Sequence, residues 1–217
     1  MNNLPTVAVH DILMHPLYDD VIIGTHGRGI WICDDITPLQ QMNNEIEAAT
    51  AHLFDQRVAT QWANISRGGS RGQFLFQGEN PPDGAMIRFY LGADAKDAKL
   101  SVSDWKGEQA IEVELKNQPG LHMHLWQFRF NPPELNEEEK ELFDSYLKTT
   151  EWEERREISE KLRESLEKRG MKYAGIDRRE NILNPIPAGP GVYKVTLTVN
   201  GMSMTKPLTV RKDPLFQ

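Results

Sequence analysis

Short apolar runs separated by turns rich in glycine, proline, asparagine and aspartate fill most of the chain. Such runs predict β-strands. From residue 192 to 199 apolar and polar side chains alternate, and Asn200-Gly201 is a strong signal for a two-residue hairpin turn. Strands of this length and spacing favour a β-sandwich. The expected strands cover residues 6–14, 21–23, 30–33, 52–54, 58–62, 73–76, 85–91, 98–103, 110–115, 121–130, 192–199 and 202–210.

Residues 134–170 have a different pattern, with 13 acidic and 8 basic side chains and no glycine before the last position. Apolar residues recur there at spacings of three and four, as on one face of a helix. Asn136 with Glu139, and Thr150 with Glu153, have the spacing of a capping box. We therefore predict two helices that form a hairpin inserted into the sandwich, with the closing glycine as the stop of the second helix.

The stretch Asp20–Asp35, DVIIGTHGRGIWICDD, has two apolar runs around a turn with three glycines, which is typical of a β-hairpin. With its neighbours it closely resembles the last blade of secreted β-propellers of the BNR-repeat, sortilin-like group, where a "DLVIGTHGRGIWILDDITPL"-like segment ends the propeller. Further similar segments follow in order and cover most of the chain except the helical insert. They are GENPPDGAMIRFYL at 78–91, GLHMHLWQFR at 120–129, PAGPGVYKVTLTVNG at 187–201 and KDP at 212–214.

The expected fold class is therefore mainly β: an immunoglobulin-like β-sandwich with an inserted α-helical hairpin, preceded by a propeller-blade β-hairpin remnant. Residues 1–49 would be the blade remnant and a connector, and residues 50–217 the sandwich with its insert at 134–170. The connector would contain one short helix over about 37–49, where Leu39, Met42 and Ile46 recur at spacings of three and four. The resemblance implies that most of the propeller is missing. A blade without its neighbours exposes apolar faces and strand edges. We expect residues 6–35 to pack on the sandwich or to mediate self-association.

The charge and the length of the apolar runs argue against some classes of function. The formal net charge of −7 argues against a nucleic-acid partner. No apolar run reaches the roughly 18 residues that cross a bilayer, and the N-terminus has no signal-peptide pattern.

We expect a non-catalytic accessory or interaction domain that needs no cofactor and comes from an extracellular or periplasmic parent. Its partner would be the rest of the propeller, another protein or a polysaccharide. The alternatives are part of a glycosidase-like hydrolase whose paired carboxylates lie in the missing propeller, or a carbohydrate-binding module.

The sequence contains no catalytic motif and suggests three weak candidates for ligand binding. His26 and Arg28 lie in the glycine-rich turn of the hairpin, where function often concentrates, although turn geometry alone explains the glycines. Trp105 lies in a predicted turn and is the best exposed candidate for stacking on a sugar. It belongs to a set of aromatic residues that could line a sugar-stacking face, although a role in the core is the more common use of such residues: Trp62, Trp105, Trp126, Phe89 and Tyr90. His122 and His124 share one face of a predicted strand, which can begin a zinc site, but no third ligand is signalled nearby. We therefore predict no metal site.

Overall fold

The computed structural model describes residues 4, 6–63, 82–107 and 109–216. It is mainly β, with 39% strand and 21% helix, which confirms the predicted class at that level. The chain divides into two compact units, one formed by Met1–Gln127 with Pro190–Gln217 and the other by Phe128–Gly189. The strand expected at 73–76 and the start of the similar segment at 78–91 lie outside the described residues. The domain boundary expected near residue 50 stays a prediction.

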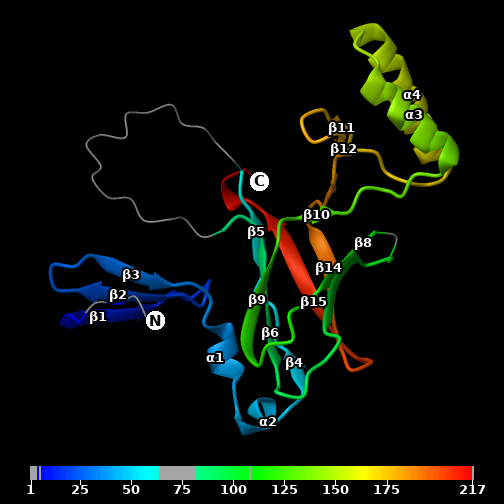
Figure 1. Ribbon diagram of the computed structural model, residues 1–217. Helices are drawn as coiled ribbons and strands as arrows, with labels where there is room; N and C mark the ends of the chain where they lie inside the picture. Colours follow the sequence, from blue (N-terminus) through cyan, green and yellow to red (C-terminus); the bar gives the residue numbers. More distant parts are fainter. Residues whose placement is uncertain (1–3, 5, 64–81, 108, 217) are drawn as a thin grey trace. The chain divides into compact units, whose positions relative to one another are not determined.

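The largest sheet of the first unit has five strands in the order β5-β15-β14-β7-β8 (Figure 1). Every pair is antiparallel except β5 with β15. The predicted alternation along β14 is confirmed, because Tyr193, Val195, Leu197 and Val199 are buried and their neighbours are not. Strand bounds are β5 (Ala59–Gln61), β7 (Lys99–Asp104), β8 (Ala110–Glu114), β14 (Gly191–Val199) and β15 (Met202–Lys212).

A second sheet of this unit has the order β4-β6-β9, with β4 at Ala51–Leu53, β6 at Ala85–Leu91 and β9 at Gly120–Trp126. Every second side chain of β6 is buried, which gives this sheet one core-facing side. Trp126 contacts Tyr193 of β14 with 4.9 Å between ring centroids. The buried faces of both sheets therefore contribute to the core. The strand expected over 121–130 ends at Trp126, since Phe128 has a φ of +55° that breaks the extended backbone.

The N-terminal sheet is an antiparallel meander of β1 (Val9–Met14), β2 (Val21–Thr25) and β3 (Ile30–Cys33), so the three expected strands form (Figure 1). The single helix expected over 37–49 is wrong. It is divided into α1 (Thr37–Gln41) and α2 (Asn44–Glu47), because Met42 is extended and the Asn43 side chain accepts a hydrogen bond from the backbone N–H of Ile46 at 2.9 Å. Asn43 is therefore an N-cap, a residue role that apolar spacing does not reveal.

The second unit contains the two predicted helices, α3 (Glu137–Lys148) and α4 (Trp152–Lys168). The capping box of Asn136 with Glu139 is confirmed, with both hydrogen bonds at 2.9 Å. The second predicted box is wrong, because α4 begins after Glu151 without a side-chain cap. Four two-residue strands complete this unit: β10 (Arg129–Phe130), β11 (Ile176–Asp177), β12 (Ile182–Leu183) and β13 (Ile186–Pro187).

Glu139 also joins the two helices, because its buried carboxylate accepts a hydrogen bond from Ser165 at 2.9 Å and forms an ion pair with Arg169. Beside it, Leu162 and Leu166 of α4 form a small apolar core with Leu183. No helix in the part of the chain that the structure describes is long and apolar enough to span a membrane.

Candidate functional site

Aspartates gather at one end of the β1–β3 sheet. Asp20 immediately precedes β2, and Asp34 and Asp35 follow β3. The first residue of β2, Val21, pairs with the last residue of β3, Cys33, so the two acidic ends are neighbours. Asp35 has a φ of +56°, a left-handed conformation that aspartate adopts more readily than most residues. The hairpin therefore concentrates negative charge at this end.

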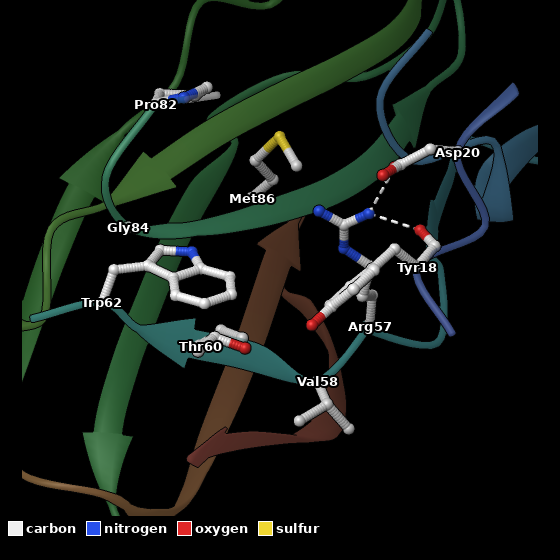
Figure 2. A pocket seen from close by; sticks show the side chains of 10 residues that line it. Tyr18, Asp20, Arg57, Val58, Thr60, Trp62, Pro82, Gly84 and Met86 are labelled. Atoms are coloured by element: carbon white, nitrogen blue, oxygen red, sulfur yellow. Dashed lines mark hydrogen bonds and ion pairs between the residues drawn. The ribbon is translucent and has the colours of Figure 1, made fainter. Parts of the chain in front are cut away.

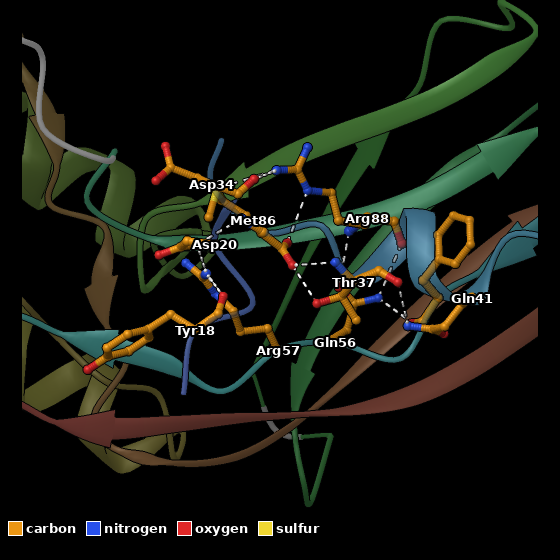
Figure 3. Close-up of polar contacts among 11 residues, drawn as sticks. Tyr18, Asp20, Asp34, Thr37, Gln41, Gln56, Arg57, Met86 and Arg88 are labelled. Atoms are coloured by element: carbon orange, nitrogen blue, oxygen red, sulfur yellow. Dashed lines mark hydrogen bonds and ion pairs between the residues drawn. The ribbon is translucent and has the colours of Figure 1, made fainter. Parts of the chain in front are cut away.

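Two arginines of the first unit pair with these aspartates (Figure 3). Arg57 lies just before β5, and its Nη1 donates to Asp20 Oδ1 at 2.7 Å and to the carbonyl of Tyr18. Arg88 of β6 donates from Nε to Asp35 Oδ2 at 3.2 Å. The side chain of Asp35 is almost completely buried and both arginines are mostly buried, so these ion pairs are screened less than surface pairs.

The network extends around Asp35 and Arg88. Asp35 Oδ1 accepts from the hydroxyl of Thr37 at 2.6 Å, so both carboxylate oxygens of Asp35 are used. Gln56 exchanges two hydrogen bonds with the backbone of Arg88, at 3.0 and 3.2 Å. Burial raises the pKa of Asp34, and the negative charge of Asp20 raises it further. These contacts connect the acidic end of the β1–β3 sheet to β6 and to the segment before β5.

A pocket with a volume of about 240 Å³ opens beside this network (Figure 2). Its walls come from the turn after β1, from β5 and its flanks, and from the start of β6. The ring of Tyr18 lies near two guanidinium groups, with its centroid 5.8 Å from Arg57 and 5.6 Å from Arg211. Arg211 also donates to the Tyr18 hydroxyl at 2.9 Å. The lining residues are Tyr18, Asp20, Arg57, Val58, Ala59, Thr60, Trp62, Pro82, Gly84 and Met86.

None of the three residues singled out by the sequence lines this pocket. His26 is exposed in the β2–β3 turn, where its ring stacks on His10 with 4.9 Å between centroids. Arg28 is exposed in the same turn, and its carbonyl accepts from the indole of Trp31 at 3.2 Å. Trp105 is exposed in the β7–β8 turn, with Lys194 Nζ 4.9 Å from its ring centroid. The candidates thus lie in turns of two different sheets.

The two histidines of β9 have separate environments. His122 stacks on Phe89 with 5.4 Å between centroids, and its Nε2 lies 2.6 Å from the carbonyl of Gln118. Burial lowers the pKa of His124. Among the residues that the structure describes, no group of three or more histidine, cysteine, aspartate or glutamate side chains could hold a metal ion.

Sequence reasoning missed Arg57, Arg88 and Tyr18, whereas Trp62, one of the aromatic residues considered for sugar stacking, does line the pocket. A signal for the two arginines exists, because the Asp19-Asp20 and Asp34-Asp35 pairs flank adjacent strands and concentrate negative charge that a nearby cation would stabilise. The sequence does not say which arginines supply it, since Arg57 and Arg88 lie 37 and 53 positions from the aspartates that they pair with.

No family model, curated protein or solved structure matches this chain.

Proposed function

We propose that this chain is a non-catalytic interaction module whose β1–β3 sheet serves as one blade of a secreted BNR-repeat, sortilin-like β-propeller. In this proposal, neighbouring sheets of the same propeller pack against both faces of β1–β3. The observation that carries the proposal is that both faces of this small sheet are apolar and partly uncovered.

The strand register assigns these side chains to opposite faces. Leu13 is paired with Ile22 and Ile22 with Ile32, so the three share one face. The other face carries Ile12 and Met14, because side chains alternate along a strand. The exposed fractions are 56% for Leu13 and 57% for Ile32 on the first face, and 62% for Ile12 and 54% for Met14 on the second. An antiparallel sheet that meets water on one face shows polar residues there, whereas a sheet covered on both faces is apolar on both.

The edges of this sheet support the same conclusion. The order β1-β2-β3 makes β1 and β3 edge strands among the described residues. Every residue of β1 is exposed, and three consecutive apolar residues end that strand. Natural edge strands usually carry protective charges or prolines, because an uncovered edge pairs with other chains. The ion pairs of Arg57 and Arg88 engage the acidic end of the sheet and not the apolar side chains of its two faces.

The finer fold belongs to the same proposal. We assign the five-stranded and three-stranded sheets to an immunoglobulin-like β-sandwich, with α3 and α4 as a helical insert. The contact of Trp126 with Tyr193 supports face-to-face packing of the two sheets. The position of the second unit in the sequence, between β9 and β14, supports an insertion.

The test compares this chain with a version extended through the coding sequence upstream of Met1. We expect repeats of short strands upstream, strong binding of a hydrophobic dye by the present chain, and loss of that binding in the extended chain. Backbone amides of β1 should exchange rapidly with deuterium in the present chain and slowly in the extended one.

Substitutions in the β1–β3 sheet test whether the dye binds there. Leu13→Ser/Ile32→Ser should reduce dye binding by the present chain, and the matched change Met202→Ser, at an exposed position of β15, should not. An upstream region without strand repeats, or a β1–β3 sheet equally exposed in the extended chain, would contradict the proposal. Polysaccharide hydrolysis by the present chain that depends on one of its carboxylates would favour the hydrolase alternative instead.

A further inference from the structure

We infer that the pocket between Trp62 and Arg57 binds one ring of a neutral saccharide, at a position that does not involve the faces of the β1–β3 sheet. Figure 2 shows the Trp62 indole on one side of the pocket and the Arg57 guanidinium on the other, with Met86 beside them. Small-ligand sites combine apolar walls with a few polar groups that fix orientation, and this pocket has both.

The polar groups suit hydroxyl ligands. Within the described part of the chain, all the hydrogen bonds of Arg57 start from Nη1, so Nε and Nη2 keep their protons available. Asp20 accepts through Oδ1 only, from Arg57 and from the backbone N–H of Asp35, which leaves Oδ2 available in the same range of residues. A sugar hydroxyl both donates and accepts, so adjacent hydroxyls match a donor beside an acceptor.

Trp62 supplies the apolar surface for this ligand. Its side chain is 50% exposed although it lines a pocket, so a large flat face is open to a ligand. Trp105 is 61% exposed but stands in a turn under Lys194 and lines no pocket with these polar groups. An indole offers much apolar area with few rotatable bonds, so packing a ring on Trp62 costs little conformational entropy.

Size and charge define the ligand further. The volume of about 240 Å³ lies below the range for drug-sized ligands, about 300–1,000 Å³, so the pocket suits a single ring. Arg57 is already paired with the carboxylate of Asp20, which lies on the same wall. An acidic sugar would place a second negative charge near Asp20, whereas a neutral sugar avoids that repulsion.

The test measures retention of the full chain on neutral polysaccharides: cellulose, mannan, xylan, starch, β-1,3-glucan and chitin. Calorimetry with the matching oligosaccharides gives the affinity, and polygalacturonate serves as the acidic comparison. We expect binding to at least one neutral polymer. Trp62→Ala should weaken it by about tenfold or more, because stacking area is lost. Trp62→Phe should retain most of the affinity, and Trp105→Ala, the matched control, should leave it unchanged.

Other outcomes overturn the inference. These are no binding to any neutral polymer, binding to polygalacturonate alone, unchanged affinity in Trp62→Ala with unaltered circular dichroism, or loss of affinity in Trp105→Ala. The result is separable from the proposed interaction function, since Leu13→Ser/Ile32→Ser alters the faces of the β1–β3 sheet and should leave saccharide affinity unchanged.

Discussion

The hairpins β14–β15 and β2–β3 are both antiparallel, yet they differ in how many of their apolar side chains are buried. Along β14 every buried residue from Tyr193 to Val199 is followed or preceded by a partly exposed one, so one face enters the core and the other faces outward. In β3, Ile30 and Ile32 are exposed while Trp31 and Cys33 are only partly buried. The buried face of the first hairpin is covered by other parts of the same unit, whereas the second leaves large apolar side chains exposed.

The two hairpins also differ in the contacts that connect them to the rest of the unit. β14 lies between β15 and β7, with core residues beneath it. The β1–β3 sheet contributes Ile23 to the buried residues, and the aspartates at its acidic end form ion pairs with Arg57 and Arg88. Packing therefore stabilises β14, and we expect the ion pairs to contribute more to the attachment of the β1–β3 sheet than to that of β14.

The largest predicted effect tests that contrast directly. Leu197→Ala removes a fully buried side chain of β14 and should lower the free energy of unfolding by about 3 kcal/mol, through lost burial and a cavity. Ile32→Ala, an aliphatic truncation at an exposed position of β3, should change it by less than about 1 kcal/mol. Urea denaturation of the two variants measures both values. Equal costs would show that the faces of β1–β3 are already covered in this chain.

The next prediction concerns the ion pairs. Arg88→Leu leaves the buried carboxylate of Asp35 without its cation and should destabilise the β1–β3 attachment by about 2–3 kcal/mol. Hydrogen exchange should show the loss in β2 and β3, with β14 unaffected. The double variant Arg88→Leu/Asp35→Asn removes the stranded charge and should recover most of the loss. If the double variant is no better than the single one, the charge of Asp35 is not the cause.

Much of the contrast between the hairpins could be read from the sequence, because it depends on local pattern. The alternation of β14 and the Asn200-Gly201 turn follow from neighbouring residues, and both are observed with φ values of +51° and +77° at the turn. The capping box at Asn136 is equally local. The break between α1 and α2 was missed, because the Asn43 cap competes with the apolar spacing that suggested one helix.

The site was less predictable, because its residues meet only through tertiary structure. Arg57 pairs with Asp20 and Arg88 with Asp35, across 37 and 53 positions of sequence. Nothing in the local pattern selects these arginines over others. Trp105 is exposed as expected, but the sequence could not show that Trp62, also half exposed, stands beside a pocket with polar walls.

A smaller effect separates the turns of the two hairpins. Gly201 and Gly27 both have φ above +65°, at +77° and +70°, and an added methyl group would meet no atom within 4 Å at either position. Alanine at either site therefore costs only backbone strain, about 1 kcal/mol. We expect Gly201→Ala to lower the global unfolding free energy by that amount in urea denaturation. Gly27→Ala should mainly accelerate hydrogen exchange in β2 and β3. A global loss of the same size from Gly27→Ala would show that both hairpins unfold as one cooperative unit.

The smallest effect depends on pH and on Asp34, at the acidic end of the β1–β3 sheet. Burial and the charge of Asp20 raise the pKa of Asp34 above its ordinary value of 3.8, so the folded state binds this proton more tightly than the unfolded chain. Ionised Asp34 therefore opposes folding, and its penalty appears as the pH rises through the window between 3.8 and the raised pKa.

Asp34→Asn should thus stabilise the protein at pH 7 by less than about 1 kcal/mol, because Asp34 is only partly buried and solvent still screens its charge interactions. The gain over the parent should disappear below pH 3.8, where the parent carboxyl is neutral as well. Urea denaturation of the variant and the parent at both pH values measures the difference, with Asp83→Asn, at an exposed position, as the control. A loss of stability in Asp34→Asn at pH 7 that disappears on acidification would contradict the prediction. It would mean that ionised Asp34 is a favourable partner of Arg57 or Arg88.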